Sequence, residues 1–405
     1  MKFLHTADWQ IGMRAAHVGE AAVRVREERL AAARRVVGDA RAAGAEFILI
    51  AGDVFEDNGV DRVLVQKVAD ILADFAGPVY VIPGNHDPLV PGSVWEHPVW
   101  GHGSTASGRD GAVEAVGAAR SAGHVRLLAE EKPVDIPGGV LFPCPIRAKH
   151  SGKDPTAWIP PREPRESSEP NGIRIGLAHG TVEGIHQEEP EHPIARNAAE
   201  RAGLDYLAIG HWHSTAQYAL PDGTVRMAYS GTHETTGFGE RDSGNALIVE
   251  IANAGAAPVI TPVRTGRLTW TVTEAELREP GDLPRLRAGI EALSDTAATL
   301  LEVRVSGLLA AADRDELLHL EQILASRFLH GRVDASRLRP FPGDASWTAG
   351  LPAGVVRDAA ERLQELADPA YQGTRPEGAS PEIASRALLE LYALISAAGA
   401  GEARR

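Results

Sequence analysis

The chain has 405 residues, of which 43% are hydrophobic and 24% are charged, as in an ordinary globular protein. This composition excludes disordered and fibrous classes. The formal net charge of −14 argues against a protein that coats nucleic acid, because phosphate binding needs a positively charged surface. It does not exclude an enzyme whose metal ions supply positive charge locally.

The length of the apolar runs, the first residues and the cysteine content together indicate a cytoplasmic protein. No run of about 18 apolar residues occurs, so we expect no membrane contact. The first residues become polar at once and lack the apolar segment of a signal peptide. The single cysteine, Cys144, cannot form an internal disulfide, which fits a reducing compartment.

Strands and helices alternate in the first 85 residues, which predicts an α/β fold. Strands are expected at residues 2–7, 47–51 and 79–82, and helices at residues 21–43 and 60–75. Further apolar segments, with no long helix between them, predict strands at residues 140–142, 173–178, 206–209, 225–229, 246–251 and 259–263. We therefore expect a sandwich of two sheets over residues 1–265.

The remainder of the chain has a different pattern. Residues 266–340 are expected to form a small α/β capping domain, with strands at 270–272 and 300–305 and helices at 283–293 and 311–328. Residues 337–350 have the composition of a connector. Residues 341–405 are expected to form a C-terminal helical region with helices at 353–366 and 381–396. Two long irregular loops are expected at residues 88–111 and 147–171.

Five short polar motifs follow apolar strands, and the carboxyl ends of strands are where open α/β sheets bind ligands. The motifs are Asp8-Trp9-Gln10, Gly52-Asp53, Gly84-Asn85-His86-Asp87, His179-Gly180 and Gly210-His211-Trp212-His213. Each motif alone is also typical of an ordinary turn or surface segment. Together they supply carboxylate, imidazole and amide oxygen, the ligands of ions such as Mn²⁺, Fe²⁺ or Zn²⁺. The sequence therefore predicts a centre of two metal ions that share a bridging carboxylate.

These motifs resemble those of the calcineurin-like metallophosphoesterases, and among them the SbcD-type nucleases of DNA double-strand-break repair. His5-Thr6-Ala7-Asp8-Trp9 is similar to the opening motif of that group, and Ala51-Gly52-Asp53-Val54-Phe55 to the second. Tyr229-Ser230-Gly231-Thr232 and Thr236-Gly237-Phe238 resemble the strand and loop after its metal site. The motifs cover residues 1–265, and beyond them the resemblance concerns architecture alone.

The resemblance implies two divalent ions, with Mn²⁺ preferred over Mg²⁺, Fe²⁺ or Zn²⁺. Asp53 would bridge both ions, while Asp8 and His213 would bind the first. Gln10 stands where the family generally has a histidine, and an amide oxygen is the weaker donor to that ion. The second ion would be bound by Asn85, His179 and His211.

The resemblance also implies a catalytic role for His86, which would stabilise the charge at phosphorus or protonate the leaving oxygen. Asp87 would orient the His86 imidazole, or else only cap the following turn. The resemblance implies no role for Glu56. The loop histidine His17 could approach the substrate or the first ion, but a solvated position is favoured.

Basic and aromatic residues provide candidate contacts to a DNA substrate. Arginines crowd the helix expected at residues 21–43, where a solvated face with ion pairs is favoured over a DNA track. Better candidates for phosphate contacts are Arg147, Lys149, His150 and Lys153. Stacking on unpaired bases and packing on the core are equally expected for Trp95, Trp100 and Trp158.

The leading hypothesis is a Mn²⁺-dependent DNA nuclease that works with an SbcC-type coiled-coil ATPase; a homodimer is left open. The ATPase would contact apolar stripes on the two C-terminal helices, formed by Val355, Val356, Ala359, Leu363 and Leu366 and by Ile383, Ala387, Leu388, Leu391 and Ile395. The stripes would otherwise pack on each other or on the cap. Alternative functions are a phosphodiesterase or phosphatase for a nucleotide or phosphoprotein, and a scaffold subunit whose first metal site has decayed at Gln10.

Overall fold

The computed structural model describes residues 1–100, 124–163, 172–184, 191–220, 222–279, 281–310, 313–340 and 345–402. The chain divides into two compact units, Met1–Trp270 and Thr271–Arg405. A further boundary near residue 340 stays a prediction. Parts of the two long loops expected at residues 88–111 and 147–171 lie outside the described residues.

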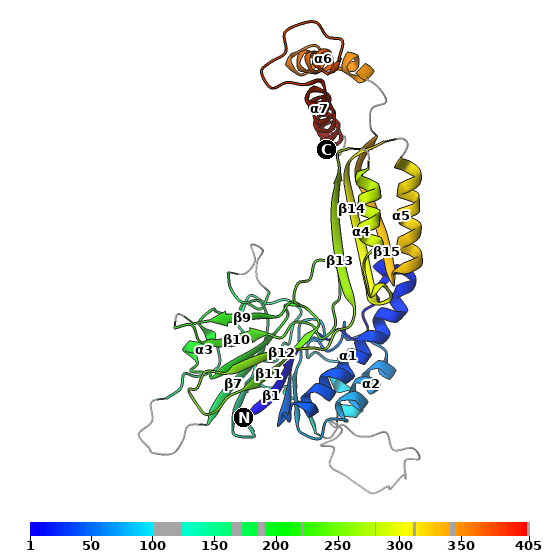
Figure 1. Ribbon diagram of the computed structural model, residues 1–405. Helices are drawn as coiled ribbons and strands as arrows, with labels where there is room; N and C mark the ends of the chain where they lie inside the picture. Colours follow the sequence, from blue (N-terminus) through cyan, green and yellow to red (C-terminus); the bar gives the residue numbers. More distant parts are fainter. Residues whose placement is uncertain are drawn as a thin grey trace. The chain divides into compact units, whose positions relative to one another are not determined.

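The first sheet of unit 1 has the strand order β12-β11-β1-β2-β3-β4 (Figure 1). Strands β1 to β4 run parallel, while β11 pairs antiparallel with both β1 and β12. β2 and β3 are buried along their whole length, as a parallel sheet covered on both faces requires. The strands are β1 (Lys2–Thr6), β2 (Phe47–Ala51), β3 (Val79–Ile82), β4 (Val125–Leu127), β11 (Asn245–Glu250) and β12 (Val259–Arg264).

The second sheet of unit 1 has the order β5-β6-β7-β8-β10-β9. Its four central strands are parallel, and antiparallel strands close both edges. The short strands β4, β5 and β9 were not predicted from the sequence. The strands are β5 (Val134–Ile136), β6 (Gly139–Pro143), β7 (Ile173–His179), β8 (Tyr206–Gly210), β9 (Ala216–Ala219) and β10 (Val225–Tyr229).

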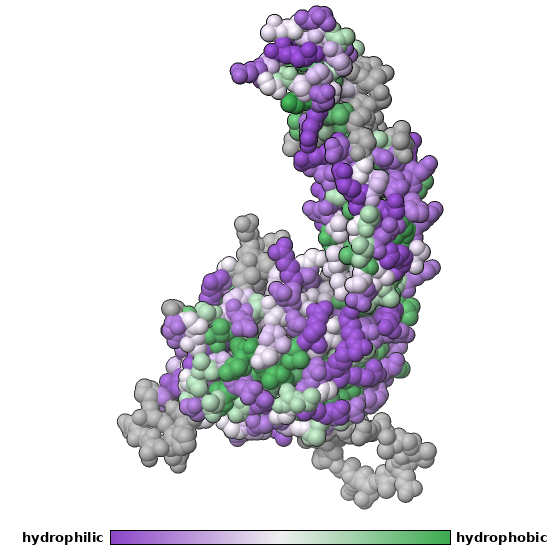
Figure 2. Space-filling view, viewed as in Figure 1, coloured by the Kyte–Doolittle hydropathy of each residue, from purple (hydrophilic) through white to green (hydrophobic). Residues whose placement is uncertain are grey.

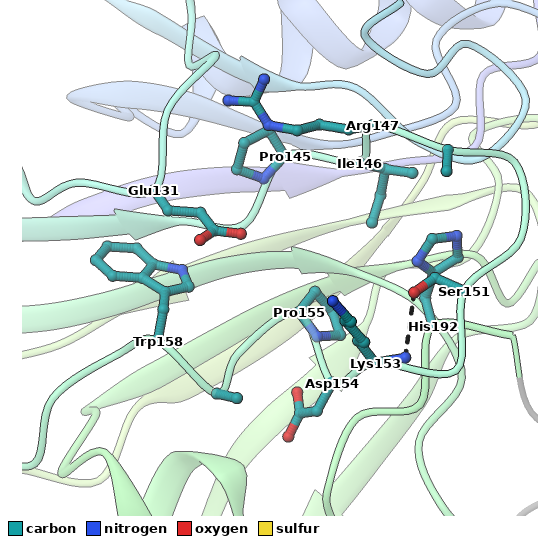
Figure 3. Close-up of a pocket in the computed structure, with 12 residues that line it drawn as sticks. Glu131, Pro145, Ile146, Arg147, Ser151, Lys153, Asp154, Pro155, Trp158 and His192 are labelled. Atoms are coloured by element: carbon teal, nitrogen blue, oxygen red, sulfur yellow. Dashed lines mark hydrogen bonds between the residues drawn. The ribbon is translucent and has the colours of Figure 1, made fainter.

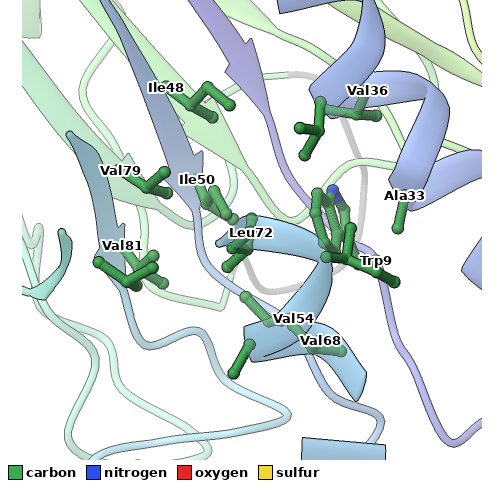
Figure 4. Packing of buried hydrophobic residues seen from close by; sticks show 14 of the residues in the cluster. Trp9, Ala33, Val36, Ile48, Ile50, Val54, Val68, Leu72, Val79 and Val81 are labelled. Carbon is green, nitrogen blue, oxygen red and sulfur yellow. The ribbon is translucent and has the colours of Figure 1, made fainter. Parts of the chain in front are cut away.

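Unit 1 is built in layers around these sheets. Helices α1 (Ala22–Ala42) and α2 (Arg62–Leu72) cover the outer face of the first sheet, where Trp9 packs with residues such as Ile50 and Val68 (Figure 4). A separate core between the sheets contains Phe3, Leu49, Leu141, Ile175 and Tyr206. The predicted two-sheet α/β sandwich is confirmed. Its shorter helices are η1 (Ala16–Ala21), η2 (Val94–Glu96), η3 (Pro98–Trp100) and α3 (Ala198–Arg201).

Unit 2 contains a three-stranded sheet with the order β13-β14-β15. Helices α4 and α5 share a core with this sheet, and the surface over them is largely hydrophilic (Figure 2). The prediction that residues 337–350 begin as a connector is wrong at Arg337–Pro340, which pairs in register with Ser306–Leu309. The elements are β13 (Thr269–Leu277), α4 (Asp282–Glu291), η4 (Thr296–Ala298), β14 (Thr299–Leu309), α5 (Arg314–Arg327), β15 (His330–Pro340), η6 (Ala345–Gly350), α6 (Val355–Ala367) and α7 (Pro381–Glu402).

None of the described helices combines the length and the apolar composition that crossing a membrane would require.

Candidate metal centre

The predicted ligands lie at the carboxyl ends of parallel strands. β1, β2 and β3 are followed by the loops that carry Asp8, Asp53 and Asn85, while β7 ends at His179 and β8 is followed by His211. Left-handed backbone occurs at Asp8 (φ 55°), Gln10 (φ 41°), Asp53 (φ 51°) and His211 (φ 103°). Non-glycine residues rarely adopt this conformation, and such strain concentrates at functional sites.

Gly84 is required by the close approach of two of these loops. A Cβ atom at this position would lie 2.1 Å from Asp53 Oδ1 and 2.4 Å from the Asp53 nitrogen. Because both atoms are held by the fold, no side chain fits there. The absence of a side chain brings the Asn85 loop directly against the Asp53 carboxylate.

The side chains of four predicted ligands converge around Asn85. Its Oδ1 atom lies 2.7 Å from His179 Nε2 and 3.0 Å from His211 Nδ1. His179 Nε2 is 3.3 Å from Asp53 Oδ2. His179 donates from Nδ1 to the Ala51 carbonyl at 2.8 Å, which fixes the ring with Nε2 facing the cluster. Ligand atoms of Asp53, His179 and His211 all lie within 4.8 Å of one another.

The electrostatics of this cluster are those of a site that attracts positive charge. Burial alone would lower the pKa of His179, but the Asp53 and Asp8 carboxylates raise it to about 9. Burial alone would raise the pKa of Asp53, but His179 and His86 lower it to about 2. Burial and the neighbouring His179 lower the pKa of His211 to about 3, so this imidazole is neutral, the form that binds metal.

Two predicted ligands of the first ion, Asp8 and His213, are held by hydrogen bonds to the His211 backbone and to two residues outside the predicted ligand set. Both Asp8 carboxylate oxygens accept from the His211 backbone N–H, at 3.0 and 3.1 Å. His213 Nδ1 lies 2.8 Å from Glu240 Oε1 and 3.0 Å from Thr236 Oγ1. A carboxylate on one ring nitrogen fixes the other toward a metal and makes it a better donor.

Glu240 and Thr236 were not identified as supporting residues from the sequence. Thr236 was noticed only as part of a motif that ended at Phe238, two residues before Glu240. A carboxylate just after this motif was the available signal, but its partner His213 could not be inferred from sequence spacing. Thr236 also donates to Glu240 through both its backbone N–H and its hydroxyl group.

Gln10 occupies a buried position on the loop that follows β1. Its side chain is 6% exposed, and its backbone N–H donates to the Asp53 carbonyl at 2.9 Å. Within the described ranges its side-chain amide has no hydrogen-bond partner. The loop thus places an amide at the position predicted from the motif, with its oxygen uncommitted.

The two predicted catalytic residues occupy different environments. His86 is half-buried, donates its backbone N–H to Asp53 Oδ1 at 2.8 Å, and has Nδ1 2.9 Å from the Glu56 carbonyl. Asp87 is fully buried, and its two oxygens accept from the N–H groups of Gly84 and Phe55. The expectation that Asp87 orients the His86 ring is therefore wrong: the Glu56 carbonyl does so, and Asp87 fixes the loop. Burial and the Asp53 charge raise the pKa of Asp87 to about 7.

Arg29 has a supporting role that the sequence did not reveal. It is 1% exposed and donates to the carbonyl oxygens of Asp8, Trp9 and Glu234. The favoured solvated arginine face therefore does not hold for this side chain, which links helix α1 to the Asp8 loop. Burial lowers the pKa of Arg29 to about 10.

The three tryptophans that were expected to contact either DNA or the core differ in their burial. Trp95 and Trp100 are 2% and 3% exposed, with ring centroids 5.6 Å apart, so they pack in the core and cannot stack on bases. Trp158 is half-buried, packs on Phe142 and lines a cavity of about 460 Å³ (Figure 3). Arg147 and Lys153 line the same cavity. His150 is exposed and bound to Glu191.

The residues fit two divalent cations by the chemistry of their donors. The Asn85 oxygen, the Asp53 carboxylate and two imidazole nitrogens converge on one side, and Asp8 with an oriented His213 lies on the other. Buried carboxylates need cations nearby, and carboxylate with imidazole is the usual donor set for Mn²⁺, Fe²⁺ and Zn²⁺.

Comparison with known proteins agrees with this geometry. Residues 1–215 match the family model for calcineurin-like phosphoesterases. An uncharacterized metallophosphoesterase of Bacillus subtilis (strain 168), YhaO, is 25% identical over 263 residues, which are 62% of this chain and 58% of that protein. A solved crystal structure aligns over 65% of this chain and 98% of its own length at 10% identity, with a TM-score of 0.37, too low to carry an argument. The family match covers more than half of the chain, which therefore belongs to the calcineurin-like phosphoesterase family.

Proposed function

We propose that this protein is a dimetal-dependent nuclease that hydrolyses phosphodiester bonds in DNA. The convergence of Asp53, Asn85, His179 and His211 carries the hydrolytic part of the proposal. The DNA substrate rests on the sequence motifs at residues 5–9, 51–55 and 229–238, which resemble those of SbcD-type nucleases. A repair function follows from the same resemblance.

The residues divide the work of the reaction. When bound, two divalent ions acidify a water molecule and neutralise charge on the phosphate oxygens. Asp53 would contact both ions, with Asp8, Gln10 and His213 on one side. His86 lies beside Asp53, and the Glu56 carbonyl accepts from its Nδ1, so a protonated ring would present an Nε2–H to the leaving oxygen or to the charge at phosphorus. The ligands of the other ion would be Asn85, His179 and His211.

The test compares substrates and two aspartate variants. The full chain with Mn²⁺ is assayed on single-stranded DNA, bis-p-nitrophenyl phosphate and cyclic nucleotides. We expect DNA cleavage, and a loss on the order of 10³-fold or more in Asp53→Asn, because the bridging charge is removed. The exposed neighbour Asp57 provides the matched control Asp57→Asn, which should retain full activity. Turnover of cyclic nucleotides without DNA cleavage would contradict the nuclease proposal and support a nucleotide phosphodiesterase.

We further propose that helices α6 and α7 bind an SbcC-type coiled-coil ATPase. Each helix buries part of its apolar stripe, with Leu366 at 6% and Leu388 at 9% exposure. Other apolar side chains of the two helices face solvent, with Val355 at 84%, Val356 at 50% and Ile383 at 56% exposure. Exposed apolar residues on neighbouring helices support a partner surface.

Charged substitutions in the full chain test this partner. Val356→Glu with Ile383→Glu should abolish co-purification with the ATPase, because burying an unpaired charge at an interface is costly. Leu318, which is 56% exposed on α5, gives the control Leu318→Glu, and binding should survive that change. Retained co-purification of the double variant would exclude α6 and α7 as the binding surface.

A further inference from the structure

A cavity of about 430 Å³ adjoins one predicted ligand of each ion, His213 of the first and His211 of the second. Its lining combines the imidazoles of His211 and His213 with the aromatic rings of Trp212 and Phe238, and Ser214 and Glu240 are its other polar residues. Trp212 stands between the two histidines in the chain and is 37% exposed. A partly exposed indole in the lining of a cavity beside predicted metal ligands offers a planar surface for a planar group.

The walls of this cavity are held in place by the fold. The Phe238 ring meets Trp270 edge-on with ring centroids 4.9 Å apart, and the His17 ring also packs on Trp270, with centroids 5.6 Å apart. The two loops that supply Trp212 and Phe238 are joined, because the Thr232 N–H donates to the His213 carbonyl at 2.9 Å and the Thr215 N–H to the Asp242 carbonyl at 3.0 Å. The aromatic walls are therefore preorganised for binding.

The cavity of about 460 Å³ at Trp158 is less suited to a nucleotide (Figure 3). Its two basic side chains, Arg147 and Lys153, are offset by two acidic ones, Glu131 and Asp154. The Arg147 guanidinium is already bound to the Ala129 carbonyl. No residue of its lining belongs to the predicted ligand set, whereas the cavity at Trp212 is lined by two of them.

We propose that Trp212 and Phe238 form a subsite for the nucleobase of the nucleotide whose phosphate lies at the metal centre. The inference rests on the nuclease function proposed above and specifies its substrate contact. An aromatic wall stacks on any base, so the subsite would bind single-stranded nucleic acid with little sequence preference. A nucleotide whose base lies in this cavity would have its phosphate beside His211 and His213.

Binding of two small probes to the Mn²⁺-loaded full chain tests the subsite by calorimetry. The probes are thymidine 5′-monophosphate and 2-deoxyribose 5-phosphate, which share sugar and phosphate and differ by the base. Wild type should bind the nucleotide on the order of 10-fold more tightly. Trp212→Leu should remove this difference without changing the affinity for 2-deoxyribose 5-phosphate, Trp212→Phe should restore most of it, and Trp158→Leu should leave it intact.

Three outcomes would overturn the subsite. These are equal binding of the two probes to wild type, equal weakening of both in Trp212→Leu, and loss of the difference in Trp158→Leu instead. DNA cleavage by wild type separates this result from the nuclease proposal. A Trp212-dependent preference for the nucleotide without DNA cleavage would keep the subsite and remove the nuclease. DNA cleavage with equal binding of the two probes would support the nuclease proposal and contradict the subsite.

Discussion

The two halves of the metal centre differ in what holds their ligands. Around Asn85 the predicted ligands contact one another, with His179 and His211 nitrogens at 2.7 and 3.0 Å from one amide oxygen. Around Asp8 the contacts run to supporting groups, because His213 is held by Glu240 and the Gln10 amide has no partner among the described residues. One half is assembled by its own ligands, and the other depends on neighbouring loops.

This difference predicts unequal affinities for the two ions. A preformed cluster binds metal without the cost of ordering its side chains, whereas a looser group with an amide in place of an imidazole binds more weakly. The Asp8 half should therefore fill last and empty first.

Replacing His86 separates chemistry from metal binding in both halves. His86→Ala keeps the backbone N–H that donates to Asp53, so both ions should still bind. Loss of the imidazole should slow DNA hydrolysis by about 10²–10⁴-fold. Metal content by mass spectrometry and single-turnover rates measure the two effects. His319→Ala, at an exposed histidine of α5, is the control, and a full rate in His86→Ala would remove His86 from the reaction.

Gln10→His should reduce the contrast between the halves. An imidazole is a stronger donor than an amide, so the Mn²⁺ concentration needed for half-maximal activity should fall by roughly 10–100-fold. The tighter site should be unaffected, which titration of Mn²⁺ by electron paramagnetic resonance would show. An unchanged titration, or equal filling of both sites in wild type, would show that the glutamine is already a full ligand.

Glu240→Gln should increase the contrast. Burial would lower the pKa of His213, but the hydrogen bond and charge of Glu240 raise it, and both effects make the ring a better ligand. Without the carboxylate, Mn²⁺ affinity of the Asp8 half should fall about 10-fold, with the Asn85 half unchanged. Glu130→Gln, at an exposed carboxylate, is the control. Equal weakening of both sites would contradict the division into halves.

Acid should destabilise the fold that holds both halves of the metal centre, because a buried core histidine must become protonated when the chain unfolds. His5 is fully buried beside the Tyr206 hydroxyl, and burial lowers its pKa from 6.5 to about 3. Between these values the unfolded chain binds more protons, so stability is full above pH 6.5 and falls by about 1.4 kcal/mol per pH unit below it from this group. In His5→Gln the difference in urea-unfolding free energy between pH 7.5 and 5.5 should shrink by about 1 kcal/mol. An unchanged difference would exclude His5 as the cause.

The sequence was sufficient to locate the buried apolar strands and the polar residues that follow them, but not the short strands β4, β5 and β9. Apolar runs such as residues 47–51 and 79–82 are long enough to identify buried strands, and the polar motifs begin where these runs stop. Because parallel strands end at one edge of a sheet, Asp53 and Asn85 could be expected near each other. The apolar runs and the polar motifs after them involve neighbouring residues, so they can be found in a single sequence.

The tertiary structure alone decided which groups support the ligands. Asp87 faces two backbone N–H groups instead of His86, Glu240 supports His213, and Arg29 reaches Glu234 across a separation of 205 residues. Trp95 could have been a surface or a core residue until packing buried it. Hydrogen bonds and burial of this kind depend on segments that folding brings together, and sequence spacing carries no information on their distances.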